Sequence, residues 1–186
     1  MRIVAGRHRG RRLDAPPGRV ARPTADRVRQ ALFDMLAHSA YVELEEARVV
    51  DAFAGSGALG LEALSRGAAF VSFLESHADS LAAITANIAA LKEEARTGVK
   101  RCDAARPPAA PQPCTLAFLD PPYHSDLAGP CLEGLAAQGW LAAEALVVVE
   151  VAADEDFAPP TAFTPVDERR HGAAKLIFLV YGTSAP

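Results

Sequence analysis

The segment Asp120-Pro121-Pro122-Tyr123 combines groups that can activate an amine and hold a flat ring, and it directly follows the apolar run 116–119. A carboxylate and a rigid backbone carbonyl can accept hydrogen bonds from both N–H groups of an amine conjugated to a ring. These bonds strengthen as positive charge develops on the nitrogen. The two prolines restrict the backbone, and Tyr123 offers a face on which a base can stack. The same residues also suit an ordinary turn, so the interpretation needs a second motif.

That second motif is a glycine-rich loop, residues 51–60, which follows another apolar run. Glycines allow positive φ and close approach of a ligand to the backbone at the carboxyl end of a strand. Gly55, Gly57 and Gly60 also fit the G-x-G-x-x-G spacing of dinucleotide sites, so spacing alone leaves a nicotinamide cofactor and S-adenosylmethionine open. Asp51 favours S-adenosylmethionine, because an acid just before the turn would crowd a pyrophosphate.

Acids also end later strand-like runs. Glu75 ends the run 70–75, where a carboxylate would hold ribose hydroxyls with either cofactor, and Asp103 could bind an adenine amine or cap a turn. Glu150 is a weaker candidate at a further strand end. The predicted cofactor-binding residues are Asp51, Phe53, Ala54, Gly55, Ser56, Gly57, Glu75, Ser76, Asp103 and Ala104, and the predicted catalytic residues are Asp120, Pro121, Pro122 and Tyr123.

The charge of the chain is unevenly distributed. Residues 1–30 hold nine arginines and two aspartates, a net charge of +7, so a total of −4 leaves −11 for the remainder. Arginine binds phosphate through a planar fork and stacks on bases, which favours RNA contact, although a solvated face or salt bridges to the acidic remainder are the alternatives. The candidate RNA-contact residues are Arg2, Arg7, Arg9, Arg11, Arg12, Arg22, Thr24, Arg27 and Arg29.

Strand-like and helix-like segments alternate from residue 48 onward. Strands are expected at 48–53, 70–75, 99–102, 115–119 and 145–151, and helices at 57–66, 77–95 and 126–138. This alternation predicts an α/β sandwich with a mostly parallel, Rossmann-like sheet and ligands at the carboxyl ends of its strands. A last strand at 175–181, after the segment 165–172, predicts an antiparallel edge. Prolines in the crossover 103–114 exclude a normal helix and predict an extended surface connection.

Length and composition indicate one globular domain. We expect a basic extension over residues 1–40, with a hairpin or arm at 2–13 and a helix from residue 23, followed by a core over 41–186. No stretch has the roughly 20 apolar residues of a membrane span, and the amino terminus lacks a secretion signal, so a cytoplasmic protein without a membrane partner is expected. Three scattered cysteines favour a reducing compartment and no structural zinc or other metal.

Together the motifs resemble the bacterial RsmD-type family of small-subunit (16S) ribosomal RNA guanine-N2 methyltransferases. The resemblance is carried by residues 2–6, 9–13, 22–24, 26–29, 31–33, 51–67, 118–123 and 139–141. The proline-rich crossover at 107–113 and Ser76, where many relatives have an acid or asparagine, depart from the pattern.

The resemblance implies methyl transfer from S-adenosylmethionine to the N2 amine of a guanine in 16S ribosomal RNA, by a monomer acting on an assembling small subunit. Asp120 and the Pro121 carbonyl would then orient the amine, and Tyr123 would stack on the base. The alternatives are an adenine-N6 or cytosine-N4 methyltransferase, a nicotinamide oxidoreductase and a non-catalytic RNA-binding assembly factor. A DNA enzyme would need a sequence-reading domain, and an oxidoreductase would need an acid such as a Tyr-x-x-x-Lys pair.

Overall fold

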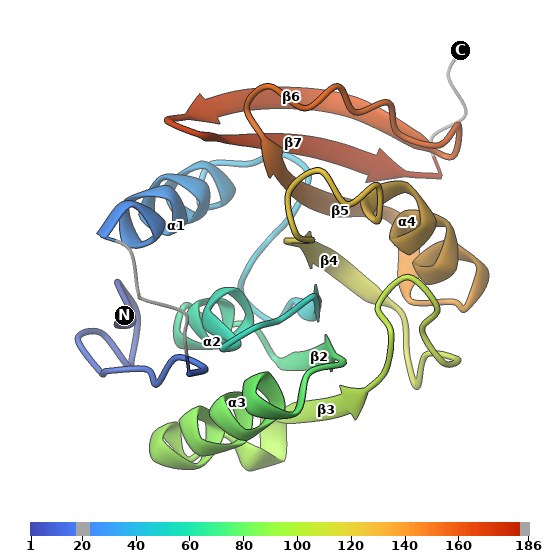
Figure 1. Cartoon of the computed structure of the whole chain (residues 1–186). Helices are drawn as coiled ribbons and strands as arrows, with labels where there is room; N and C mark the ends of the chain where they lie inside the picture. Colours follow the sequence, from blue (N-terminus) through green and yellow to red (C-terminus); the bar gives the residue numbers. More distant parts are fainter. Residues whose placement is uncertain (18–22, 183–186) are drawn as a thin grey trace.

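The protein is described by a computed structural model that covers residues 1–17 and 23–182. One sheet contains seven strands in the order β3-β2-β1-β4-β5-β7-β6 (Figure 1). The strands are β1 (Arg48–Ala52), β2 (Phe70–Glu75), β3 (Thr97–Arg101), β4 (Cys114–Leu119), β5 (Leu141–Ala152), β6 (Phe163–His171) and β7 (Ala174–Tyr181). Strands β1 to β5 are parallel, and β7 and β6 add an antiparallel end. The predicted mixed sheet is confirmed, although the outer strand is β6 and the last strand, β7, lies inside the sheet.

Helices cover both faces of this sheet. Figure 1 shows α1 (Pro23–Leu36), α2 (Ala58–Ser65) and α3 (Ala78–Leu91) on one side and α4 (Ala128–Ala137) on the other, and a short 3-10 helix, η1 (Glu94–Arg96), follows α3. Because side chains of a strand alternate between faces, Val49 packs in the core beneath α1 to α3 and Val50 packs in the core beneath α4. The predicted α/β sandwich is therefore confirmed.

The connection from β3 to β4 has no helix, as its prolines predict. It is nevertheless tied to the neighbouring structure more closely than a surface connection requires. Trp140 Nε1 donates a 2.8 Å hydrogen bond to the Pro108 carbonyl, and Pro107 is buried. A Cβ atom added to Gly134 of α4 would lie only 2.8 Å from the Pro107 ring. Pro107 thus packs against α4, in addition to the effect of the prolines in preventing a helix.

The amino-terminal segment, residues 1–17, folds back on itself and lies beside α2 and α3 (Figure 1). Arg2 and Arg12 form an antiparallel bridge, which confirms a hairpin-like arrangement. Ile3 and Leu13 are buried in the same core as Phe33 of α1. The segment therefore shares the core beneath α1 to α3.

No helix in the described ranges is long and apolar enough to cross a membrane.

Candidate active site

The predicted polar strand ends meet at one edge of the sheet. The Asp120 backbone N–H donates to the Ala52 carbonyl at 3.4 Å, and the Ala54 N–H donates to the Leu74 carbonyl at 3.2 Å. The Cys102 N–H donates to the Glu75 carbonyl at 3.0 Å. These bonds bring together the carboxyl ends of four parallel strands, which we call the rim: residues 51–57, 75–76, 102–104 and 120–123.

The glycine loop of the rim has backbone φ angles that residues with a side chain rarely adopt. Gly55 and Gly57 have φ angles of 59° and 77°, and Phe53 also lies in the left-handed region at 59°. Gly57 immediately precedes α2. The loop is held by an acid from the next strand, because the Gly55 N–H donates to Glu75 Oε2 at 2.8 Å. The spacing of glycines thus sets the conformation, and Glu75 fixes it.

Two buried carboxyl groups at the loop differ in their surroundings. Asp51 is 1% exposed, and burial raises its pKa well above the ordinary value, despite a 2.9 Å hydrogen bond from the Gly60 N–H. The negative charges of Asp120 and Glu75 raise it further. Burial would also raise the pKa of Glu75, but hydrogen bonds from the backbone N–H groups of His77, Gly55 and Ser76 outweigh it, so this pKa is lowered. Glu75 is therefore an ionised acceptor, whereas Asp51 supports the start of α2.

The rim fits the cofactor that the motifs predict. An ionised carboxylate has about four acceptor positions, and Glu75 Oε2 receives one bond from Gly55, which leaves capacity for a ribose hydroxyl. Asp103 is exposed, but its Oδ1 accepts the Ala105 N–H at 3.0 Å, so the turn-capping alternative is realised for that oxygen. Among the other predicted residues, Ser76 is exposed, Phe53 is half-buried, and Ala54, Ser56 and Ala104 are buried.

Residues 120–123, the segment predicted to activate an amine, differ from one another in solvent exposure. Asp120 and Pro122 are exposed and Pro121 is buried. Tyr123 is 40% exposed, and its hydroxyl donates a 2.8 Å hydrogen bond to Glu150 Oε1. Burial raises the pKa of Glu150, and the bond from Tyr123 opposes that change. The structure thus places Glu150, a weak candidate in the sequence and an interior residue of β5, directly at Tyr123.

The candidate RNA-contact residues fall into three groups. Arg2, Arg7, Arg9, Arg11, Arg12 and Arg27 are exposed. Arg22 and the Thr24 side chain lie outside the described part of the chain. Arg29 contradicts its prediction: it is 4% exposed, and its guanidinium donates to the Arg2 carbonyl at 2.6 Å and to Asp26 at 2.9 Å. For Arg29 the salt-bridge alternative is correct, because its Nε also lies 3.7 Å from Oε2 of the buried Glu62.

Three buried polar residues that hold the amino-terminal segment were missed by the sequence reasoning. Glu62 of α2 is fully buried and accepts the Val4 and Ala5 N–H groups at 2.8 and 3.0 Å. Glu93 pairs with Arg7 and His8, and Asn87 bonds to the backbone of Asp14. For Glu62 and Asn87 the signal in the sequence is a polar residue among apolar neighbours of a helix, whereas Glu93 lies between Lys92 and Glu94 and has no such signal.

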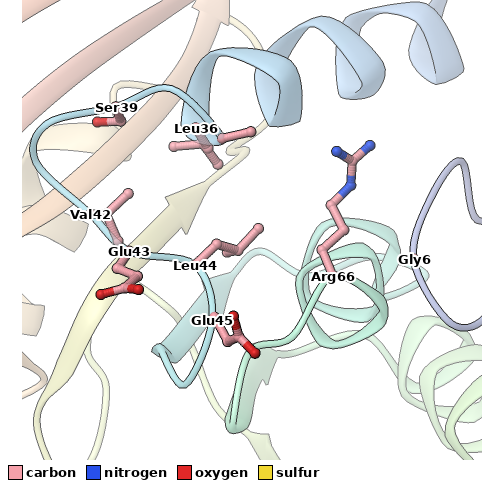
Figure 2. A pocket seen from close by; sticks show the side chains of 9 residues that line it. Gly6, Leu36, Ser39, Val42, Glu43, Leu44, Glu45 and Arg66 are labelled. Carbon is pink, nitrogen blue, oxygen red and sulfur yellow. The ribbon is translucent and has the colours of Figure 1, made fainter.

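A separate hollow of about 620 Å³ lies away from the rim. Its lining is Gly6, Leu36, Ala37, Ser39, Val42, Glu43, Leu44, Glu45 and Arg66 (Figure 2). The segment 42–45 precedes β1 and Arg66 follows α2, so this hollow is at the amino ends of the strands. It is on the opposite edge from the glycine loop.

Comparison with known proteins identifies the family of this chain. The family described as Conserved hypothetical protein 95 matches residues 1–180. The chain belongs to this family. The names of similar proteins and of similar solved structures agree with the motifs found at the rim.

Ribosomal RNA small subunit methyltransferase D of Haemophilus influenzae is 36% identical over 176 residues, 92% of this chain and 89% of the relative. The Escherichia coli protein of that name is 39% identical over 150 residues, 81% of this chain and 74% of the relative. A solved Escherichia coli structure, described as a candidate methyltransferase, matches with a TM-score of 0.81 and 34% identity over 98% of both chains. The resemblance to the RsmD-type family and the Rossmann-like methyltransferase fold are confirmed.

Proposed function

We propose that this protein is an S-adenosylmethionine-dependent methyltransferase that modifies the exocyclic N2 amine of a guanine in small-subunit ribosomal RNA. The observation that carries the proposal is the position of Asp120, the first residue of the segment 120–123, beside the start of the glycine loop, in a chain whose relatives are named for that RNA. Glu75, the loop residues 53–57 and Ser76 would hold the cofactor. When bound, the cofactor supplies an electrophilic methyl group.

The residues at the end of β4 have the chemistry to prepare the amine. The Asp120 carboxylate and the Pro121 carbonyl accept its two N–H groups, which localises the nitrogen lone pair and directs it away from both acceptors. These bonds strengthen as positive charge grows on the nitrogen, so they stabilise the transition state more than the ground state. Tyr123 holds the ring by stacking. As the nitrogen–methyl bond forms, the sulfur–methyl bond would break, and the cationic nitrogen then releases one proton to solvent past the exposed Asp120 carboxylate.

The first 40 residues serve as an RNA-binding extension of the methyltransferase core. The remainder of the chain is acidic, so the exposed arginines of residues 1–17 provide the attraction for phosphate. They act on the position of the RNA and not on the methylation chemistry. The basic segment lies beside α2 and α3, and α2 is the helix that follows the glycine loop.

The test is mass mapping of ribosomal RNA. Small subunits and free 16S RNA from cells that lack the protein are incubated with the purified protein and S-adenosylmethionine, then digested to nucleosides. Appearance of N2-methylguanosine supports the proposal, whereas N6-methyladenosine or no new methyl group overturns it. Calorimetry must also give binding of S-adenosylhomocysteine and none of NAD, because the glycine spacing alone fits both cofactors.

A further inference from the structure

Asn87 of α3 connects the amino-terminal segment, the proposed RNA-binding part, with the glycine loop, the proposed cofactor-binding part. It is 2% exposed and lies among buried apolar residues of its helix. Its Oδ1 accepts the Asp14 N–H at 2.7 Å, and its Nδ2 donates to the Asp14 carbonyl and to the Ser56 carbonyl, both at 3.0 Å. One planar amide therefore bonds the amino-terminal segment and the glycine loop at once.

The two ends of this connection are both constrained elsewhere. Ser56 lies between Gly55 and Gly57, whose positive φ angles fix the loop, and Glu75 holds the Gly55 N–H. Asp14 follows the hairpin-like turn that carries the exposed arginines. A movement of the loop that redirects the Ser56 carbonyl must tilt the Asn87 amide and weaken its bonds to Asp14.

Asn87 differs from the other anchors of the segment in this respect. Glu62 receives the Val4 and Ala5 N–H groups, and Glu93 pairs with Arg7 and His8. The hydrogen bonds and ion pairs of these two carboxylates in the described structure are with the segment and with neighbouring arginines, and none is with the glycine loop. They hold the segment, but no hydrogen bond or ion pair of theirs in the described structure would change when the glycine loop moves.

We infer that Asn87 is a positioning residue that couples cofactor binding to RNA binding. This inference rests on the proposed function. Bound cofactor reinforces the loop conformation that Glu75 already holds, the loop holds the Asn87 amide, and the amide holds the base of the arginine-bearing segment in register. Coupling between two sites is reciprocal, so RNA must raise the affinity for the cofactor by the same factor by which the cofactor raises the affinity for RNA.

The experiment measures both affinities in the full-length protein. The RNA probe is 16S ribosomal RNA transcribed without modification, titrated with and without saturating S-adenosylhomocysteine, and the converse titration uses calorimetry. In the wild type we expect each ligand to tighten the other by the same factor, about fivefold or more. Asn87→Leu removes every bond of the amide, and Asn87→Asp keeps the acceptor for the Asp14 N–H while losing the donor to Ser56. Both should reduce the coupling factor to about one.

Glu93→Gln, two residues after the end of α3, is the matched control. It weakens the pairing with Arg7 and His8 without touching the loop, so it should lower RNA affinity and leave the coupling factor unchanged. A merely structural role for Asn87 would instead lower both affinities and leave the factor intact, which overturns the inference. Absence of coupling in a wild type that binds both ligands also overturns it and leaves the proposed function standing. Failure of the wild type to bind either ligand overturns both.

A measurement without substitutions protects the test against a variant that does not fold. S-adenosylhomocysteine should slow hydrogen exchange of the Asp14 backbone N–H in the wild type, because this proton is donated to Asn87 Oδ1. The Val4 N–H, donated to Glu62, is the internal reference and should change less. Equal exchange of the Asp14 N–H with and without the ligand overturns the inference.

Discussion

The rim and the amino-terminal segment are both rich in polar groups, but they are built in opposite ways. In the rim, Glu75 and Asp51 bond to backbone N–H groups of a loop within 20 residues of each acid. The amino-terminal segment is held by side chains that are 27 to 85 residues away in the chain, among them Arg29, Glu62 and Glu93. The two acids that hold the glycine loop, Asp51 and Glu75, are thus buried, whereas the segment keeps its arginines exposed.

The difference reflects what each region has to recognise. A cofactor is small, so its site benefits from a backbone fixed by short connections and desolvated acceptors. An RNA surface is large and charged, and exposed arginines bind it through phosphate contacts that depend on salt. Substitutions in the rim should therefore change rates and cofactor affinity, and substitutions in the segment should change RNA affinity and its salt dependence.

The largest effect is expected at Asp120. Asp120→Ala should reduce the single-turnover rate of methyl transfer by about 10²- to 10³-fold, the usual cost of losing one group that stabilises developing charge. Affinity for S-adenosylhomocysteine should stay within a few-fold, because the lost bonds act on the amine. Asp154→Ala is the control, since Asp154 is an exposed acid on the loop after β5. A rate for Asp120→Ala equal to that of the control would remove Asp120 from the chemistry.

The next effect concerns Glu75 and the cofactor. Glu75→Ala should weaken S-adenosylmethionine binding by roughly 1.5–3 kcal/mol, the scale of hydrogen bonds to a charged group, and calorimetry measures it. Unchanged affinity would contradict the assignment.

The same substitution has a pH signature. The pKa of Glu75 is lowered in the fold, so its ionised form stabilises the protein above its ordinary value of 4.5, and that contribution is lost as the pH falls through the lowered pKa. The difference in unfolding free energy between wild type and Glu75→Ala should therefore be larger at pH 7 than at pH 3.5, as urea unfolding would measure. A difference that grows on acidification would contradict the lowered pKa.

A third prediction addresses the arginines. Arg9 and Arg12 are exposed and have no side-chain hydrogen bond or ion pair with the described residues, so their removal leaves the anchors of the segment intact. Replacing both by alanine should reduce the slope of log affinity for RNA against log salt by about 1.5 units, since each phosphate contact contributes roughly 0.7–0.9.

The matched control is Arg169→Ala with Arg170→Ala on β6, which removes the same charge at the far edge of the sheet (Figure 1). This pair should leave the slope nearly unchanged. Equal slopes for both double variants would mean that only net charge matters, and the segment would then be no more than a solvated face.

The two regions also differ in how far the sequence predicts them. The glycine loop, Glu75 and Asp120 follow strands with clear apolar runs, so the rule that strand ends share an edge suffices to bring them together. The burial of Arg29 was missed because it depends on Asp26 and on the Arg2 carbonyl across the segment. Local periodicity predicts a stripe on a helix but does not identify which distant backbone groups meet it.

The smallest effect is expected at the Tyr123 hydroxyl, within the rim. Tyr123→Phe keeps the ring and loses the bond from the hydroxyl to Glu150, a partly exposed contact, so the rate should fall by less than about tenfold. Tyr123→Ala removes the stacking surface, worth roughly 1–3 kcal/mol for one base, and should be more damaging in RNA affinity and in rate. Glu150→Gln keeps a carbonyl acceptor for the hydroxyl and should resemble the wild type. If Tyr123→Phe were as damaging as Tyr123→Ala, the hydroxyl and the half-buried Glu150 would hold the ring in place, and Tyr123 would depend on an acid as the glycine loop depends on Glu75. If the two variants differ as expected, the rigid prolines before Tyr123 suffice to place the ring.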